Sequence, residues 1–139
     1  MTFPKGKTAL LLVDIQEEQR SDSDYYAFGF DQVLSNASKL LNAARSNGYL
    51  IAHAQYIRDF SVFPRRPFEA TQPDGLPTFS DAKTGQTAIC AEVAPTANEA
   101  VFTKNDASAF LGTGLNKWLT DNETEWLIIC GVWTEACIA

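Results

Sequence analysis

A continuous apolar run near the start of the chain constrains its fold more than any other feature. Residues 8–13 read Thr-Ala-Leu-Leu-Leu-Val, and they end directly at a carboxylate, Asp14. A strand that is apolar on both faces has no side suited to water, so it is typical of a parallel sheet covered by helices on both faces. The run therefore predicts an α/β architecture.

The rest of the chain continues this pattern. Apolar residues at helical spacing predict a helix over residues 31–44, with Asp31 as its N-cap and Gly48 after its end. Three further strands are predicted at residues 49–55, 99–103 and 126–130, and a short helix at residues 114–120. This order predicts a three-layer α/β/α fold around a parallel, doubly wound, Rossmann-like sheet.

A long irregular segment interrupts this order. Residues 56–95 contain five prolines and two glycines, which disfavour regular helices and strands. Long loops inside a compact domain often cover or form binding sites. We therefore expect a lid or binding loop at 56–95 within a single domain of residues 1–139.

Composition excludes several classes of protein. The chain is 45% apolar and 20% charged, as expected for a packed core, and its net charge is −6 with no cluster of basic residues that would bind nucleic acid. No apolar run approaches the roughly 18 residues that span a bilayer, so no membrane association is expected. Three cysteines without Cys-x-x-Cys spacing argue against disulfides and a zinc ribbon and favour a reduced, cytoplasmic compartment.

Three reactive residues follow the ends of predicted strands: Asp14, Lys104 and Cys137. Ligands bind at this edge of open parallel sheets. Cys137 follows a glycine turn that predicts a helix start, where backbone N–H groups and the helix dipole favour a thiolate. Asp14 could take the thiol proton and pass it to a leaving amine, while Lys104 stabilises both negative charges. This set predicts acyl transfer from a small amide.

Each residue also has an ordinary structural alternative. Asp14 could cap a turn, Lys104 could be an exposed strand-end lysine, and Cys137 could be an inert buried thiol, as we expect for Cys130. Cys90 is interpreted as structural. His53, the only histidine, is interpreted as a strand residue with a satisfied hydrogen bond.

Three motifs resemble the isochorismatase-like cysteine hydrolase superfamily, which includes nicotinamidases and N-carbamoylsarcosine amidohydrolases. They are Leu11-Leu-Val-Asp-Ile-Gln16, Val101-Phe-Thr-Lys-Asn-Asp-Ala-Ser-Ala-Phe110 and Cys130-Gly-Val-Trp-Thr-Glu-Ala-Cys-Ile138. The resemblance implies that Asp14 is the acid/base, Lys104 the supporting cation and Cys137 the nucleophile. It also implies a cis peptide between Val132 and Trp133, and an oxyanion hole formed by the backbone N–H groups of Trp133 and Cys137.

The chain departs from this family at two places. The metal-binding Asp and first His of nicotinamidases match Gln55 and Ile57 here, so neither a metal nor another cofactor is expected. The aromatic residue that often follows the aspartate by five positions is replaced by Gln19. We therefore expect the substrate to contact residues elsewhere, namely Gln16, Tyr25, Tyr26, Phe28, Trp133 and Thr134.

The sequence thus predicts a hydrolase that cleaves a C–N bond of a small amide, carbamoyl or ureido substrate through a cysteine thioester. A homo-oligomer is expected, with the small-molecule amide as the other partner. Two alternatives stay open: isochorismatase-type vinyl ether hydrolysis, which relies on the aspartate, and a non-catalytic binding module of the same fold. Because doubly wound domains usually continue with further helices and strands, we expect this domain to be C-terminally incomplete.

Overall fold

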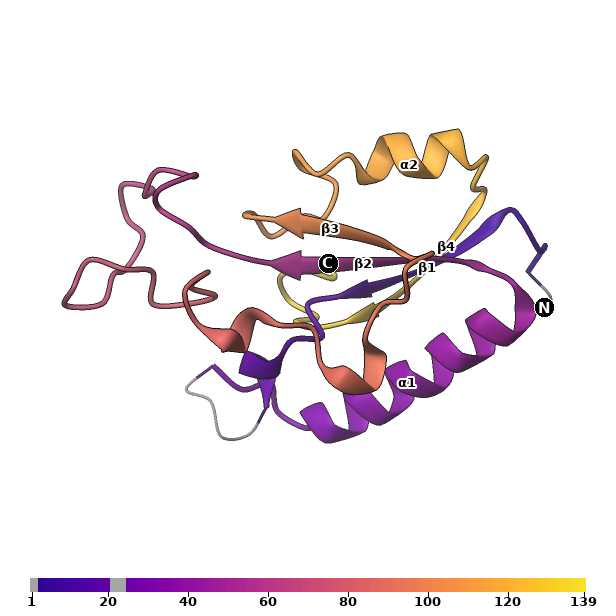
Figure 1. Ribbon diagram of the computed structural model, residues 1–139, viewed down its shortest axis with the longest axis horizontal. Coiled ribbons are helices and arrows are strands. Elements are labelled where there is room, and N and C mark those ends of the chain that lie inside the picture. The colour runs from indigo at the N-terminus through magenta and orange to yellow at the C-terminus, as the bar shows by residue number, and fades with distance from the viewer. Residues whose placement is uncertain (1–2, 21–24) are drawn as a thin grey trace.

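A four-stranded, all-parallel sheet with the order β3-β2-β1-β4 forms the centre of the protein (Figure 1). The computed structural model describes residues 3–20 and 25–139. The strands are β1 (Thr8–Val13), β2 (Leu50–Tyr56), β3 (Ala100–Lys104) and β4 (Trp126–Gly131). The parallel sheet predicted from the apolar runs is confirmed, and β1, whose residues are all buried, lies between two neighbours.

The two helices cover opposite faces of this sheet (Figure 1). Helix α1 (Phe30–Asn47) packs Leu34 and Leu41 into one core with Leu10 and Leu12 of β1. Helix α2 (Leu115–Asp121) packs Leu115 into a second core on the other face. The predicted three-layer architecture is therefore confirmed. Among the described residues, no helix combines the length and apolar character needed to cross a membrane.

The start of α1 differs from the prediction. Gly29, in the left-handed conformation with φ 71°, is the N-cap, and Asp31 lies inside the first turn, so the prediction of an Asp31 cap was wrong. Glycine accepts this backbone conformation at little cost, which lets the chain enter the helix from the loop before it. The predicted end is confirmed: Gly48 is the C-cap, and its N–H donates to Ala44 and Arg45 carbonyls.

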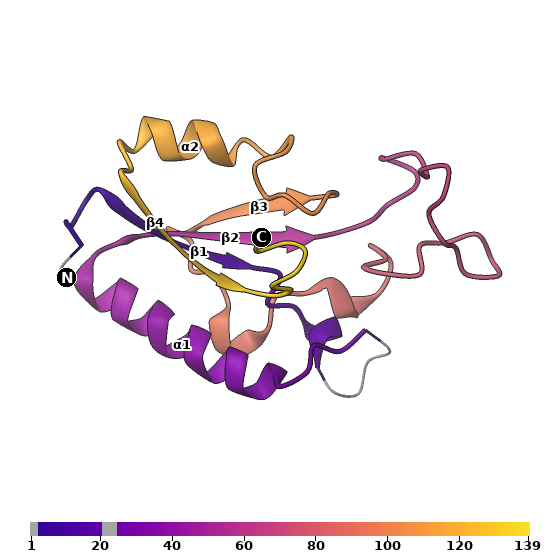
Figure 2. The same cartoon turned by 180° about the vertical axis from the view of Figure 1, so that it is seen from behind.

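Residues 132–139, which follow β4, form turns. The N–H groups of Ala136 and Ile138 both donate to the carbonyl of Trp133, at 3.1 and 3.2 Å. Two donors converging on one carbonyl do not form the i to i−4 ladder of an α-helix. Cys137 therefore lies in a tight turn, and the segment after β4, drawn in yellow, lies at the carboxyl edge of the sheet (Figure 2).

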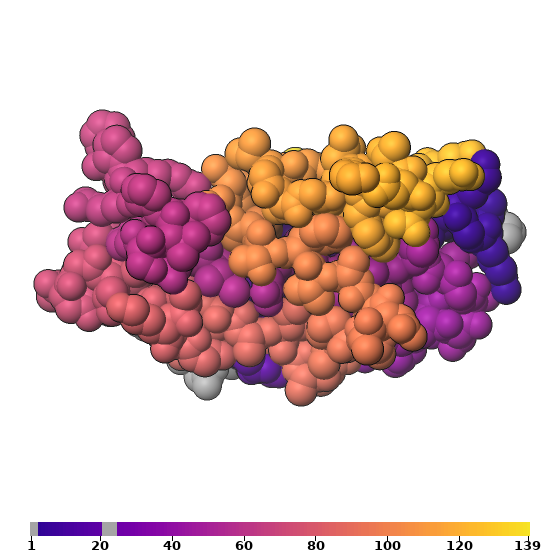
Figure 3. Space-filling model, turned by 45° about the horizontal axis from the view of Figure 1, so that its top comes forward, coloured from indigo at the N-terminus to yellow at the C-terminus, as the bar shows by residue number. Residues whose placement is uncertain are grey.

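The residues between β2 and β3 form an irregular segment that projects beyond the carboxyl ends of the strands and makes one end of the molecule (Figures 1 and 3). Its only regular pieces among the described residues are two single 3-10 turns, η2 (Gly85–Thr87) and η3 (Ala91–Val93). Main-chain hydrogen bonds attach it to the turn after β1, η1 (Glu17–Gln19), since the Glu17 N–H donates to the carbonyl of Ala88 at 2.9 Å.

Replacing Gly131 by alanine is expected to destabilise the fold by about 3 kcal/mol. Gly131 has φ 147° and pairs with Val13 across the β1–β4 ladder. A Cβ atom there would lie 2.0 Å from the carbonyl oxygen of Val13, so the two strand ends would have to separate. Urea unfolding monitored by circular dichroism measures the loss.

Gly75→Ala is the matched control, because Gly75 also has a positive φ, 83°, but nothing lies within 4 Å of an added Cβ atom. That variant should lose only the backbone cost, about 1 kcal/mol. Equal losses in the two variants would show that the close approach to Val13 is unimportant.

Candidate active site

Asp14, Lys104 and Cys137 come together at the carboxyl edge of the sheet. Asp14 directly follows β1, Lys104 is the last residue of β3, and Cys137 lies in the turn after β4. The Lys104 ammonium is 2.8 Å from Asp14 Oδ2 and 3.3 Å from Cys137 Sγ. The ammonium thus contacts both the carboxylate and the thiol, and the three groups come from the ends of three different strands.

The Lys104 side chain is fixed across the end of β2. It is 1% exposed, and its Nζ lies 4.8 Å from the ring centroid of Tyr56, within the range of a cation–π contact. The ammonium also donates to the carbonyl of Asp106 at 3.1 Å. With Asp14, Cys137 and Asp106 as acceptors, its three N–H groups all have partners. The exposed strand-end alternative for Lys104 is therefore wrong.

The Asp14 side chain is a buried carboxyl group. The residue is 4% exposed and its N–H donates to the carbonyl of Ala54 at 2.9 Å. Its Oδ1 is buried and lacks a hydrogen-bond partner among the described residues. Burial raises the pKa of the Asp14 carboxyl above its usual value, while the Lys104 ammonium opposes that rise. Asp14 is therefore a stronger proton acceptor than an exposed carboxylate.

The surroundings of the Cys137 thiol favour its protonated form. Burial raises its pKa, the Asp14 carboxylate raises it further, and Lys104 acts in the opposite direction. A nucleophilic Cys137 therefore needs a proton acceptor during attack, and Asp14 lies close enough to interact with the thiol.

A cavity of about 440 Å³ opens over Asp14 and Cys137. Four aromatic side chains, which we call the aromatic wall, line it: Tyr25, Tyr56, Phe79 and Trp133. Phe79 is at the centre of the wall, with ring centroids 5.1 Å from Tyr25, 5.6 Å from Tyr56 and 6.1 Å from Trp133. The other lining residues are Gln19, Arg66, Asp106, Ala107, Val132 and Ala136.

The expected substrate-binding residues are distributed over three places. Tyr25 and Trp133 line the cavity, as expected. Tyr26, Phe28 and Thr134 line a second hollow, which shares Val132 and Trp133 with the cavity but contains neither Asp14 nor Cys137. These three do not line the cavity over Asp14 and Cys137.

The prediction that Gln16 contacts the substrate is also wrong. Gln16 is fully buried, and its amide nitrogen donates to the carbonyls of Tyr56 and Thr87 at 3.0 and 2.8 Å. Its Oε1 accepts the N–H of Tyr56 at 2.7 Å. With both ends of the amide engaged in the backbone, Gln16 is a structural residue that does not line the cavity.

Sequence reasoning missed Tyr56, Phe79 and Arg66 as cavity residues. Tyr56 directly follows the predicted strand at 49–55, at the same edge as Asp14, and that position could have identified it. Phe79 and Arg66 lie in the irregular segment, where no periodicity indicates which side chains turn inward. Arg66 donates to the carbonyl of Asn105 at 2.6 Å and pairs with Asp106 at 3.1 Å.

The turn after β4 provides candidate oxyanion donors. The Val132–Trp133 peptide is cis, as the resemblance implied. Within the described ranges, the backbone N–H groups of Trp133 and Cys137 donate to no other backbone carbonyl. Both groups are therefore available to a ligand in the cavity, which Trp133 and Cys137 also line.

The residues at the tentative metal positions do not suit a metal. The Gln55 amide donates to Thr103 Oγ1 at 2.9 Å, and Ile57 has no donor atom. His53 is buried and its Nε2 lies 2.9 Å from Glu99 Oε2, while Glu99 also pairs with Arg45. His53 is thus a satisfied core residue, as interpreted from the sequence.

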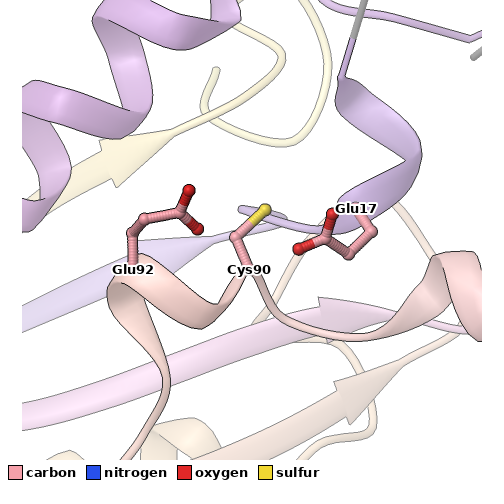
Figure 4. A group of neighbouring side chains, drawn as sticks. All are labelled: Glu17, Cys90 and Glu92. Carbon is pink, nitrogen blue, oxygen red and sulfur yellow. The ribbon is translucent and has the colours of Figure 1, made fainter. Parts of the chain in front are cut away.

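A separate group of potential ligands, Glu17, Cys90 and Glu92, lies away from the cavity (Figure 4). Arg20 pairs with both of its carboxylates, at 2.5 Å to Glu17 and 2.8 Å to Glu92. Burial raises the pKa of the Cys90 thiol to about 12. The guanidinium offsets one of the two carboxylate charges, and the protonated thiol agrees with the structural interpretation of Cys90.

Comparisons with known proteins agree with this geometry. The family model described as Isochorismatase domain matches residues 8–139. Maleamate amidohydrolase of Pseudomonas putida is 30% identical over 95% of this chain and 62% of its own length. N-carbamoylsarcosine amidase of an Arthrobacter species is 30% identical over 79% of this chain and 42% of its own length. The chain therefore spans less than two thirds of either relative.

A solved structure shows the same fold. The cysteine hydrolase from Pseudomonas syringae pv. phaseolicola 1448A superposes with a TM-score of 0.84, with 99% of this chain and 68% of that chain covered. Its sequence identity is 20%. The likeness therefore concerns the arrangement of the sheet and helices.

Proposed function

The chain belongs to the isochorismatase family of hydrolases, and from that premise we propose that it cleaves a C–N bond of a small amide, carbamoyl or ureido compound through a thioester on Cys137. One observation carries the proposal: the Lys104 ammonium lies 2.8 Å from Asp14 and 3.3 Å from Cys137 at the bottom of an aromatic cavity. Base, cation and nucleophile are thus in contact before any substrate binds.

In the first half of the reaction, Asp14 takes the proton of Cys137 while the sulfur attacks the carbonyl carbon. The backbone N–H groups of Trp133 and Cys137 hold the oxygen that becomes negative. The C–N bond then breaks as Asp14 gives the proton to nitrogen, so that ammonia or an amine leaves and a thioester remains. Lys104 stabilises the charge on Asp14 and sulfur throughout.

In the second half, water replaces the amine. The oxygen of the water attacks the thioester carbon while Asp14 takes a proton from that water. Asp14 then gives the proton to sulfur as the C–S bond breaks. The acid product leaves and Cys137 is restored. The raised pKa of Asp14 suits both directions, because the carboxyl must accept and donate a proton near neutral pH.

The relatives and the cavity support an amide as substrate. The names of the two relatives denote hydrolysis of maleamate and N-carbamoylsarcosine, which both contain a C–N bond next to a carbonyl. The aromatic wall offers an apolar surface to the group attached to that carbonyl. We also propose that the protein is a homo-oligomer. We place it in the cytoplasm, in line with its free cysteines, and we propose that it binds no nucleic acid, in line with its acidic composition.

Alkylation by iodoacetamide, combined with a screen of small amides for ammonia release, tests the proposal. We expect peptide mass spectrometry to find modification at Cys137 in step with the loss of activity, and a hydrolysed amide to protect it. Cys90 and Cys130 serve as internal controls, because burial raises their pKa to about 12 and about 11. Full activity after complete alkylation of Cys137 would favour vinyl ether hydrolysis, which needs no thiol. An unreactive Cys137 and no ammonia would favour the binding module.

A further inference from the structure

The turn that follows Asp14 is buried although its side chains are polar. Gln16, Glu18 and Gln19 are 0%, 3% and 2% exposed. Buried polar groups must be hydrogen-bonded to be tolerated, so the partners of such a turn show what it holds in place. Each of these three side chains bonds to a different segment that contributes a ring to the aromatic wall.

Glu18 holds the segment of Phe79. Its two carboxylate oxygens accept the N–H of Ser80 at 3.1 Å and the hydroxyl of Ser80 at 2.5 Å. Ser80 has φ 52°, a left-handed conformation that is unusual for a residue with a side chain and persists only where the surroundings enforce it. Glu18 therefore fixes the backbone next to Phe79, the central ring of the wall.

Gln19 and Gln16 hold two further rings. Trp133 Nε1 donates to Gln19 Oε1 at 2.7 Å, which fixes the orientation of the indole. Gln16 bonds to both backbone groups of Tyr56, as described above. A single short turn thus connects to Tyr56, Phe79 and Trp133, although these rings come from β2, the irregular segment and the turn after β4.

We propose that the buried turn of residues 16–19 sets the shape of the aromatic wall, and that Glu18 and Gln19 are specificity-determining positioning residues. The inference rests on the proposed amide hydrolysis for its substrate class. Neither residue needs to contact the reacting atoms. Their loss should weaken binding of amides with an aromatic group, which needs aligned rings, and should spare amides too small to reach the wall.

Isosteric replacements separate this role from general stability. Glu18→Met and Gln19→Met keep the side-chain volume but accept no strong hydrogen bond. Glu18→Gln and Gln19→Glu serve as conservative rescues. Glutamine at 18 keeps an acceptor for the Ser80 N–H, and the Ser80 hydroxyl can accept from its amide. Glutamate at 19 keeps an acceptor for Trp133 Nε1. Glu92→Gln is the control, since Glu92 contacts the same turn through Arg20 and touches no ring of the wall.

The experiment compares benzamide with acetamide in two ways. The first is the ratio of their kcat/KM values for ammonia release. The second is the ratio of their dissociation constants, measured by ligand-observed NMR in proteins that also carry Cys137→Ala. We expect both methionine variants to reduce the preference for benzamide about tenfold, which corresponds to about 1.4 kcal/mol. The rescues and Glu92→Gln should stay within about threefold of the unmodified preference.

The two measurements distinguish the failure of this inference from that of the proposed function. If no amide is hydrolysed but the binding preference falls as expected, the turn still shapes the cavity and only the reaction is wrong. Equal losses for both amides, or an unchanged preference, would overturn the inference. If Glu18→Met does not fold, Gln19→Met decides the outcome by itself.

Discussion

Replacing Cys137 by alanine is expected to lower kcat/KM for the best amide substrate by at least about a thousandfold. In the proposed reaction the sulfur forms the covalent intermediate, and Cys137 is the only cysteine that lines the cavity among the described residues. The loss should appear mainly in kcat, because the aromatic wall that binds the substrate stays intact. Ammonia release at several substrate concentrations measures both constants.

Cys130→Ala is the matched control for this variant. Cys130 lies on β4, seven positions before Cys137, and does not line the cavity. Burial raises its pKa to about 11, which makes it a poor nucleophile. Its loss should leave kcat/KM within about twofold. Undiminished turnover by Cys137→Ala would instead place the chemistry on Asp14 alone.

The sheet and the meeting of the reactive residues could be predicted because both depend on local patterns. Each strand is an apolar run, and parallel strands point their carboxyl ends to the same edge, so residues that follow those ends become neighbours. Asp14 and Lys104 are 90 positions apart, yet their places after two such runs were enough to bring them together. No knowledge of side-chain packing was needed.

The shape of the cavity could not be predicted, because it depends on contacts that leave no periodic signal. Phe79 lies in a segment without regular structure, and its position follows from the bonds between Glu18 and Ser80, which are 62 positions apart. Gln16 is a residue whose position in the sequence led to a wrong prediction. Its place close after Asp14 suggested contact with substrate, but its amide donates to the backbone carbonyls of Tyr56 and Thr87.

The expected state of the thiol changed for a related reason. The glycine turn before Cys137 suggested a helix start and therefore a thiolate. The structure shows turns, and burial beside Asp14 raises the pKa of the thiol. In the proposed reaction Cys137 therefore has to transfer its proton to Asp14, so we expect turnover to depend on the carboxylate as well as on the sulfur.

Asp14→Asn is accordingly expected to lower kcat/KM by at least about a hundredfold while the protein remains folded. Asparagine has nearly the shape of aspartate and tolerates the left-handed conformation seen at Asp14, where φ is 53°. The amide cannot accept the thiol proton. Circular dichroism and urea unfolding check the fold, and Asp121→Asn on the exposed end of α2 is the control for loss of a carboxylate.

The pH dependence of the unmodified protein tests the same role of Asp14 without a mutation. Only the deprotonated carboxylate accepts a proton, so kcat/KM should fall as the pH drops through the pKa of Asp14. Because burial raises that pKa, the acid limb should lie above pH 3.8, the ordinary value for aspartate. Asp14→Asn should lose this limb from its residual rate, because the titrating group is gone. An identical acid limb in both proteins would show that another group accepts the proton.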